Sequence, residues 1–120
     1  MRRSEHICPR YQHAIEILGK RWTGLSLKVL MNGPLRFNEL AEKLDVVSDR
    51  ILSERLKELE AELVVERRVF PESPVRVEYR LTDKGQALAP VVDAIEQWGE
   101  RWVEVSAAQK SCEAAAEKSC

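Results

Sequence analysis

The stretch SDRILSERLKELEAELVVERRVFPESPVRVEYRLT, residues 48–82, decides the fold, because its hydrophobic pattern changes period in the middle. Over residues 48–62 apolar side chains recur on one side of a helical wheel that turns about 100° per residue. That apolar side consists of Leu52, Leu56, Leu59 and Leu63. Residues 64–70 and 75–81 have the composition of strands, and the second alternates strictly between apolar and polar side chains. A helix followed by a β-hairpin is therefore predicted, with residues 71–74 as the hairpin loop.

Two helices are predicted on the N-terminal side of this unit. Residues 11–18 repeat apolar side chains on one face of a helix, and Gly19 ends the pattern. Residues 22–31 form a second such stretch, which the turn residues 32–34 end. The inward side chains of the second helix are predicted to be Trp22, Leu25, Val29 and Leu30.

A third helix and a tight turn connect these helices to residues 48–62. An extended piece at residues 35–36 precedes a helix over 38–44, for which Asn38 is the predicted N-cap. Residues 45–47 form the turn, and Ser48 caps the next helix. Two short helices joined by a tight turn and followed by a hairpin define a winged helix-turn-helix. The predicted fold class is thus mainly α with a small β-hairpin wing.

The C-terminal part is predicted to complete a single domain. Thr82 caps a last, long helix over 83–105, and a chain of 120 residues has room for one core. We assign residues 1–105 to one DNA-binding and dimerisation domain. Residues 106–120 have helix propensity but no apolar stripe, which is typical of a flexible tail.

Bulk charge does not point to a nucleic-acid partner. The net charge is −1, and residues 85–120 carry three basic and six acidic side chains. A DNA-binding face must therefore come from the placement of charges. No apolar run approaches the ~20 residues that span a bilayer, and no apolar segment follows the basic N-terminus. We expect a cytoplasmic protein without a membrane partner.

The polar side of residues 48–62 supplies the candidate DNA contacts. Arg50 and Lys57 can reach phosphates or guanine edges, and Ser53 is small enough to let the helix enter a major groove. Ser48 lies at the N-terminal end, where such helices meet bases. An ordinary solvated helix face is the alternative interpretation. Arg55 leans toward the apolar side and is predicted to form a structural ion pair.

Two arginines outside this helix complete the candidate set. Arg76 follows the hairpin loop, where a wing tip meets DNA backbone or minor groove, and Arg36 precedes the third helix. The hairpin also carries Arg67, Arg68 and Arg80, whose roles stay open. Arginines of this kind also keep an edge strand soluble.

The ordered motifs resemble those of the HxlR family of bacterial winged-helix regulators. They are CP at 8–9, GKRWT at 19–23, GPLRFNEL at 33–40, SDRILSERLKEL at 48–59, VFPE at 69–72 and PVRVEYRLT at 74–82. The resemblance covers residues 8 to about 102. It implies a homodimer that binds a pseudo-palindromic operator near its own or a neighbouring gene. One departure is Leu63, which stands where the family has glycine. A left-handed cap there costs leucine about 1 kcal/mol, which leaves the end of the helix and the wing angle open.

The resemblance also implies that the first and last helices form the dimer interface. The sequence supports this, because the apolar stripe of the last helix is too long for one small domain to bury. The expected interface residues are Tyr11, Ile15, Leu18, Leu88, Val91, Val92, Ile95, Trp98 and Trp102.

Cys8 matches the N-terminal cysteine that senses oxidants or electrophiles in several family members. His6 and Arg10 flank it, and positive neighbours favour a reactive thiolate. The alternative is a small side chain packed at the dimer interface. A metal site of His6, Cys8 and His13 lacks a fourth ligand, so no metal or cofactor is expected. Cys112 and Cys120 lie outside the resemblance.

Three function classes follow from these observations. The leading one is a transcription regulator with Cys8 as a candidate thiol sensor, whose expected partners are duplex operator DNA, a second copy of the chain and a small electrophile or oxidant. A winged helix that docks proteins without binding DNA is the alternative. An enzyme is not expected, because no paired nucleophile and base, no phosphate-binding glycine loop and no metal-ligand spacing occurs.

Overall fold

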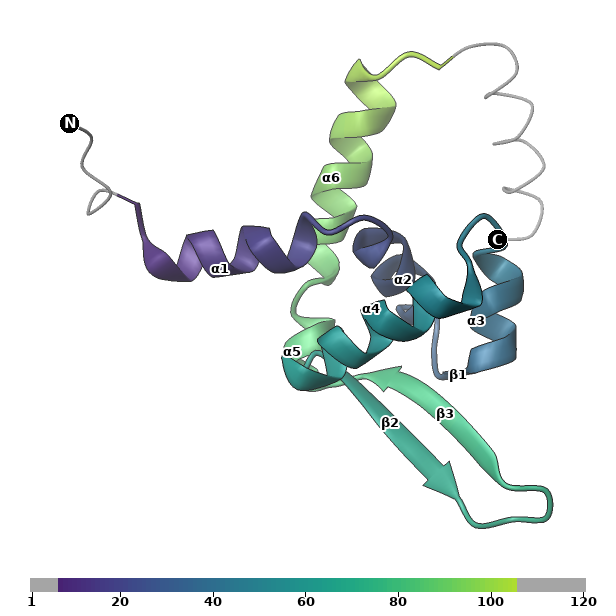
Figure 1. Cartoon of the computed structure of the whole chain (residues 1–120). Coiled ribbons are helices and arrows are strands. Elements are labelled where there is room, and N and C mark those ends of the chain that lie inside the picture. The colour runs from purple at the N-terminus through teal and green to yellow at the C-terminus, as the bar shows by residue number, and fades with distance from the viewer. Residues whose placement is uncertain (1–6, 106–120) are drawn as a thin grey trace.

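The computed structural model describes residues 7–105. Helices and a small sheet follow one another in the predicted order, and the winged helix-turn-helix is confirmed (Figure 1). The α4 helix and the β2–β3 hairpin lie together, α6 projects away from the hairpin, and α1 projects sideways. The elements are α1 (Pro9–Leu18), α2 (Thr23–Leu30), β1 (Leu35–Arg36), α3 (Phe37–Lys43), α4 (Asp49–Ala61), β2 (Val65–Phe70), β3 (Arg76–Leu81), α5 (Asp83–Gln86) and α6 (Ala89–Trp102).

The core is an aliphatic cluster beneath α4. Three of the four leucines predicted on one side of α4 are fully buried, which confirms the wheel for those positions. Burial of aliphatic side chains removes apolar surface from water, and each Å² removed stabilises the fold by about 25 cal/mol. The core residues are Leu27, Leu30, Leu40, Leu44, Val47, Leu52, Leu56, Leu59, Val64, Val65, Leu81 and Val92.

The second helix differs from its prediction at its start. Trp22 has a left-handed φ of 76° and serves as the N-cap of α2, so the helix begins at Thr23. The rotation of α2 buries Leu27 and Leu30, while Leu25 is exposed rather than inward. The buried Ser26 hydroxyl donates to the Trp22 carbonyl (2.9 Å), which fixes this entry to the helix.

The two helices of the DNA-binding motif have well-defined caps. Ser48 accepts a hydrogen bond from the Ile51 backbone N–H (3.2 Å), which confirms it as the N-cap of α4. The prediction of Asn38 as the cap of α3 is wrong. Arg36 is the N-cap, and the Glu39 carboxylate accepts from its backbone N–H (2.8 Å). The helix starts earlier because this acidic side chain reaches back to the cap.

The end of α4 is a left-handed cap despite the absence of glycine. Leu63 has a φ of 63°. Its N–H donates to the Glu60 carbonyl, and the Val64 N–H donates to the Leu59 carbonyl, both at 2.9 Å. These two bonds form a Schellman motif. The Leu63 side chain leaves the apolar side of the helix and is 68% exposed, contrary to its place on the wheel.

We expect Leu63→Gly to raise the free energy of unfolding by about 0.5–1 kcal/mol. Glycine removes the left-handed strain of about 1–2 kcal/mol, part of which the more flexible unfolded chain cancels. Urea denaturation of the wild type, Leu63→Gly and Leu63→Ala measures the effect. Alanine keeps the strained Cβ and should give no gain. A destabilised glycine variant would show that the exposed leucine side chain packs on another surface.

The hairpin belongs to a three-stranded antiparallel sheet with the order β1-β3-β2. Its register runs from Val65 opposite Leu81 to Phe70 opposite Arg76, which confirms both predicted strands. Residues directly opposite each other lie on the same face of the hairpin. One face begins with the buried pair Val65–Leu81, and the other face is mainly polar. The polar face carries three cross-strand pairs, which are Glu66–Arg80, Arg68–Glu78 and Phe70–Arg76.

The predicted long helix over 83–105 is wrong, because two helices occupy this segment. Thr82 accepts from the Gly85 backbone N–H (3.1 Å) and caps the short α5, as predicted for the cap. Pro90 explains the interruption, since it lacks an N–H and a continuous helix would press its ring against the Gln86 carbonyl. It is tolerated in the first turn of a new helix, α6.

Gly85 brings α5 against the start of β2. A Cβ at this position would lie 2.2 Å from the Val64 carbonyl oxygen, a distance that no side chain tolerates. The Thr82 N–H donates to the same carbonyl (3.0 Å), and the Thr82 hydroxyl donates to the Leu63 carbonyl (2.6 Å). The joint between the hairpin and α6 is therefore a contact of backbone against backbone.

In residues 7–105, no helix combines the length and the apolar content needed to cross a bilayer.

Candidate nucleic-acid interface

The exposed side of α4 carries unpaired cations. Arg50 and Lys57 are exposed, and neither forms an ion pair or hydrogen bond with the part of the chain that the structure describes. Ser53 lies between them and is half-buried, while Glu54 is exposed beside it. The side of α4 away from the leucine core thus has two cations available for an outside anion.

A network of polar contacts fixes the orientation of α4. Arg55, which is 17% exposed, donates from Nε to the Arg21 carbonyl (2.9 Å) and lies 3.2 Å from the Glu58 carboxylate. This confirms it as a structural ion-pairing residue. Lys20 also donates to Glu58 (3.0 Å), and this hydrogen bond holds the pKa of the Glu58 carboxyl below its ordinary value. The turn before α2 thereby holds α4 in place.

Arg36 lies at the start of α3, with its side chain exposed. Its backbone N–H is bound by Glu39, but its guanidinium has no partner among residues 7–105. It is therefore a third cation on the helix-turn-helix that can reach an outside anion, as a DNA contact must.

The side chain of Arg76 has contacts within its own chain. Its guanidinium lies between two carboxylates, 2.9 Å from Glu72 and 2.6 Å from Glu78, and stacks 4.0 Å from the Phe70 ring centroid. The hydrogen bond to Glu72 is the largest cause of a pKa above the ordinary value of arginine. The charge of Arg76 is thus compensated within the chain, and its contacts hold the hairpin end together. A contact between Arg76 and DNA stays a prediction.

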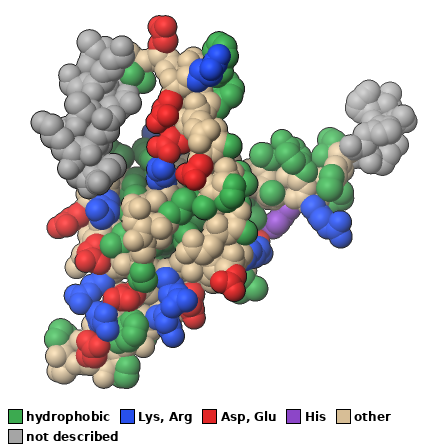
Figure 2. All heavy atoms as spheres, turned by 180° about the vertical axis from the view of Figure 1, so that it is seen from behind, with side chains coloured by type: hydrophobic (Ala, Val, Ile, Leu, Met, Phe, Trp, Pro, Cys, Tyr) green, Lys and Arg blue, Asp and Glu red, His purple; other side chains and the backbone are tan. Residues whose placement is uncertain are grey.

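Arg67 and Arg68 are the hairpin cations that the sequence left undecided. Both are exposed, and neither has an ion pair within the described residues. Arg80, by contrast, pairs with Glu66 at 3.4 Å. The register places a glutamate opposite both Arg68 and Arg80, and the two differ because Glu78, opposite Arg68, pairs with Arg76 instead. Figure 2 shows Lys and Arg side chains interleaved with acidic ones over the hairpin.

We expect Arg68→Ala and Arg76→Ala to have different salt dependences. Loss of one phosphate contact lowers the slope of log K against log salt by about one, so Arg68→Ala should flatten it. Arg76→Ala should weaken binding to all duplexes several-fold with an unchanged slope, because it loosens the hairpin end without removing a free charge. Fluorescence anisotropy across a salt series measures both. The opposite pattern would make Arg76 the phosphate contact.

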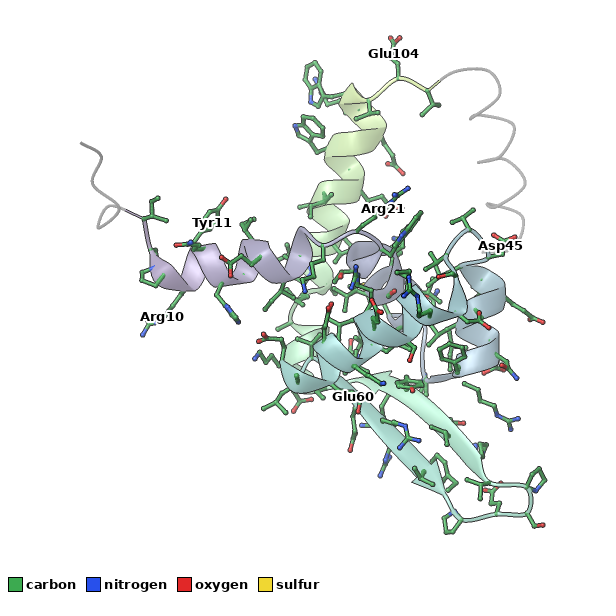
Figure 3. The ribbon with its side chains drawn as sticks, in the orientation of Figure 1. Arg10, Tyr11, Arg21, Asp45, Glu60 and Glu104 are labelled. Carbon is green, nitrogen blue, oxygen red and sulfur yellow. The ribbon has the colours of Figure 1, made fainter. Side chains whose placement is uncertain are left out.

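The α1 and α6 helices expose apolar side chains on the single chain. No residue of α1 is buried, and Tyr11 and Arg10 point to opposite sides of it (Figure 3). On α6, Trp98 is 62% exposed. The large apolar side chains exposed on the two helices are Tyr11, Ile15, Val91, Ile95, Trp98 and Trp102.

Three of the predicted interface residues pack against the chain's own core. Val92 is only 8% exposed and belongs to the core, and Leu18 and Leu88 pack against it. The apolar stripe of α6 is wider than the area that α2 covers. One edge of the stripe packs on α2, and the other edge stays exposed. Lys28 on α2 reinforces this packing through an ion pair with Glu96 on α6. Val92 therefore lies on the edge of α6 that faces the chain's own core.

Cys8 lies at the exposed end of α1. It is the N-cap residue, and its thiol is free. His6, Cys112 and Cys120 lie outside the described residues. Within residues 7–105, no three His, Cys, Asp or Glu side chains are arranged to hold a metal ion.

Comparison with known proteins gives the class and then the family. YvaP, an HTH-type transcriptional regulator of Bacillus subtilis, is 53% identical over 106 residues, which cover 88% of this chain and 97% of YvaP. The HTH-type transcriptional regulator YodB of B. subtilis is 48% identical over 98 residues, 82% of this chain and 88% of YodB.

Solved structures agree with these relatives. The reduced form of YodB superposes with a TM-score of 0.75 at 48% identity, over 82% of this chain and 96% of that one. The redox regulator HypR in its oxidized form gives a TM-score of 0.76 at 35% identity. The match covers 82% of this chain and 100% of the HypR chain.

The fold, the exposed recognition side and the relatives define a helix-turn-helix transcriptional regulator. The HxlR-like helix-turn-helix family matches residues 17–107, and this chain belongs to that family. The resemblance drawn from the sequence motifs is thus confirmed. DNA binding fits these findings, and a protein-docking module without DNA does not.

Proposed function

We propose that this regulator binds a pseudo-palindromic operator as a homodimer in the bacterial cytoplasm, and that it acts without catalysis. The observation that carries the proposal is the set of unpaired cations opposite the leucine core of α4, Arg50 and Lys57 above all. An exposed helix of this kind fits the major groove, where arginine pairs with guanine edges. Ser48 and Ser53 lie where the helix approaches the bases most closely, and Arg36 can contact phosphate.

A second copy of the chain is the proposed partner of α1 and α6. Their exposed aromatic and aliphatic side chains have no cover in the single chain. Contiguous apolar surface of this kind marks a protein interface. A two-fold axis between the copies would present two α4 helices to half-sites about 34 Å apart, or a multiple of that spacing. A pseudo-palindromic operator has this symmetry.

The thiol of Cys8 is the proposed sensor. Its side chain is exposed at the start of α1, the helix that belongs to the proposed interface. Structures of the relative YodB are described as reduced, diamide-treated and quinone-bound, and HypR is described as a redox regulator. Small electrophiles and oxidants are therefore the proposed effectors. A group added at Cys8 would change how two copies meet, and thus the spacing of the α4 helices.

We expect benzoquinone to change operator affinity about tenfold through Cys8, within the usual range of coupling between two sites. The thiolate sulfur adds to a ring carbon and the electron pair moves to a quinone oxygen, which takes a proton from water. The proton on the attacked carbon then moves to the other oxygen, and the ring becomes an aromatic hydroquinone. The test compares Cys112→Ser/Cys120→Ser with the same protein carrying Cys8→Ser as well. Mass spectrometry reports the adduct and anisotropy reports DNA binding.

The double variant should respond and the triple variant should not. Equal responses of both would assign Cys8 a structural role and contradict the sensor proposal. Operator binding by the untreated proteins is measured in the same experiment, so it tests the DNA-binding proposal separately.

A further inference from the structure

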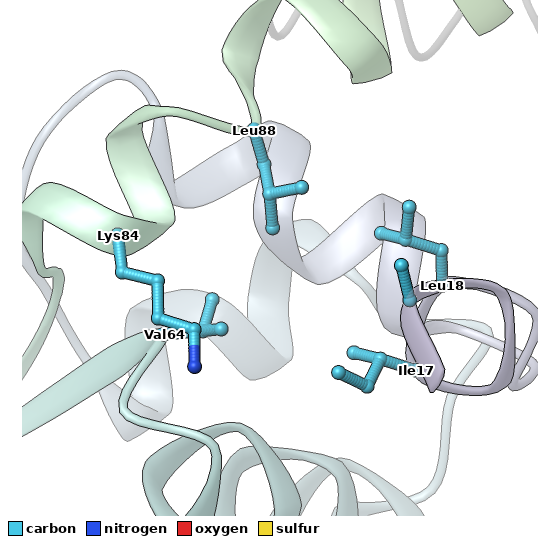
Figure 4. Close-up of a pocket in the computed structure, with 6 residues that line it drawn as sticks. Ile17, Leu18, Val64, Lys84 and Leu88 are labelled. Carbon is cyan, nitrogen blue, oxygen red and sulfur yellow. The ribbon is translucent and has the colours of Figure 1, made fainter. Parts of the chain in front are cut away.

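A small apolar pocket lies where α1 meets the body of the domain. Its volume is about 140 Å³. Figure 4 shows the pocket between side chains of α1, of Lys84 in α5, and of Val64 and Leu88, the residues just before β2 and α6. The lining residues are Ala14, Ile17, Leu18, Val64, Lys84 and Leu88. Five of these six are apolar, and Lys84 is the only charged one.

The volume fits one six-membered ring. An enclosed aliphatic cavity of about 150 Å³ holds a single benzene molecule, and this pocket offers a similar volume while being partly open to solvent. The side chains here are aliphatic in the same way, and their surface attracts an apolar ring by its removal from water. A larger ligand would need the surrounding helices to separate.

Lys84 selects the functional group on the ring. Its Nζ donates one hydrogen bond, to the Glu62 carbonyl (2.6 Å). An ammonium group has three donors, so two remain for a ligand. The Glu62 carboxylate is itself bound by His13, whose Nε2 lies 3.0 Å and 3.1 Å from its two oxygens. The positive charge at the pocket edge therefore favours an acceptor with negative charge.

We propose that this pocket binds a monocyclic aromatic carboxylate without a covalent bond. The ring occupies the aliphatic volume and the carboxylate accepts from Lys84. Such a ligand differs from an electrophile at Cys8, because it forms no bond to sulfur and its site is built from other residues. The site therefore lies beyond the thiol chemistry proposed above.

The pocket lies at the junction of the parts that must move together. Ile17 and Leu18 belong to α1, and Val64 directly follows the cap of α4. The His13–Glu62 hydrogen bond also joins α1 to the end of α4. A ligand in the pocket binds one arrangement of α1 and α4 more tightly than others. By linkage, such a ligand changes DNA affinity, and DNA changes ligand affinity by the same factor.

Benzoate is the probe that tests the site. It is titrated into the reduced full-length protein, with methyl NMR spectra and calorimetry as readouts. We expect shifts centred on the methyl groups of Ile17, Leu18, Val64 and Leu88. Benzamide, which has the same ring without the charge, should bind about tenfold more weakly, because a charge-assisted hydrogen bond is lost. Acetate, which lacks the ring, should not bind.

Two variants and a control make the test specific. Lys84→Met should remove the preference for benzoate over benzamide, and Ala14→Phe should fill the volume and abolish binding of both. Lys43→Met removes an exposed lysine of α3 that is far from the pocket lining and should change nothing. Circular dichroism checks that each variant is folded. If Ala14→Phe does not fold, the binding of benzoate and benzamide to Lys84→Met tests the proposal.

Three results would overturn the proposal. One is the absence of benzoate-induced shifts at the pocket methyls in the wild type. Another is equal loss of binding in Lys84→Met and Lys43→Met. The third is a set of contacts between the pocket methyls and the second copy of the chain, which would show that the partner already fills the volume. None of these results bears on operator binding, so the proposed function is tested independently.

Discussion

Trp98→Glu should prevent the proposed dimer from forming and lower operator affinity by about a hundredfold or more. The indole is 62% exposed on the single chain and shares the open edge of α6 with Ile95 and Trp102. A charge placed there would be buried between two apolar helices without a partner, at a cost of several kcal/mol. Without the second copy, the avidity gain of about 10²–10⁴ from binding two half-sites together disappears.

Gln97→Glu is the matched control for this experiment. It adds the same charge one residue away, at another exposed position of α6. Sedimentation equilibrium reports the oligomeric state and anisotropy reports affinity for a full operator and a single half-site. We expect Gln97→Glu to remain dimeric. An intact dimer of Trp98→Glu and of Trp102→Glu would place the interface elsewhere on the molecule.

Arg50→Ala should weaken operator binding about 5- to 150-fold and relax the sequence preference at one base pair. These factors correspond to the roughly 1–3 kcal/mol of one bidentate contact between arginine and guanine. Arg50 has no intramolecular ion pair within residues 7–105, so its removal leaves no buried carboxylate behind. The loss would therefore report the DNA contact itself.

Lys57→Ala gives the contrast. Lys57 lies two turns further along the same side of α4, where a lysine contacts phosphate as a point charge. We expect weaker binding to every sequence with unchanged preference. Selection of bound sequences from a random library measures preference for the wild type and both variants. An unchanged preference of Arg50→Ala would mean that another part of the chain contacts the bases.

The recognition helix and the hairpin could be predicted because both are amphipathic. A single helical period placed three leucines of α4 in the core and left the cations outside, as the structure shows. Arg55 was assigned inward by the same wheel, and its contacts with Arg21 and Glu58 confirm the assignment. Periodicity reports burial directly, and burial decides these positions.

Other features depend on contacts that periodicity does not contain. The pairing of Arg76 with Glu72 and Glu78 needs the hairpin register and the position of its loop. The wide apolar stripe of α6 does not reveal which edge packs on α2, so the burial of Val92 in the chain's own core could not be predicted. Leu63 shows the reverse case, since the tertiary fold imposes a backbone conformation that the side chain disfavours.

The missing Cβ of Gly85 has a consequence for how such regulators diversify. Because backbone touches backbone at this joint, no side chain can repack there to lengthen or shorten the span between the hairpin and α6. The joint therefore fixes the distance between the hairpin and α6, the helix proposed to contact the second copy. Mutations on the outside of α4 can alter which bases are preferred without changing this distance. Base preference and this distance are in this sense separately heritable properties of the fold.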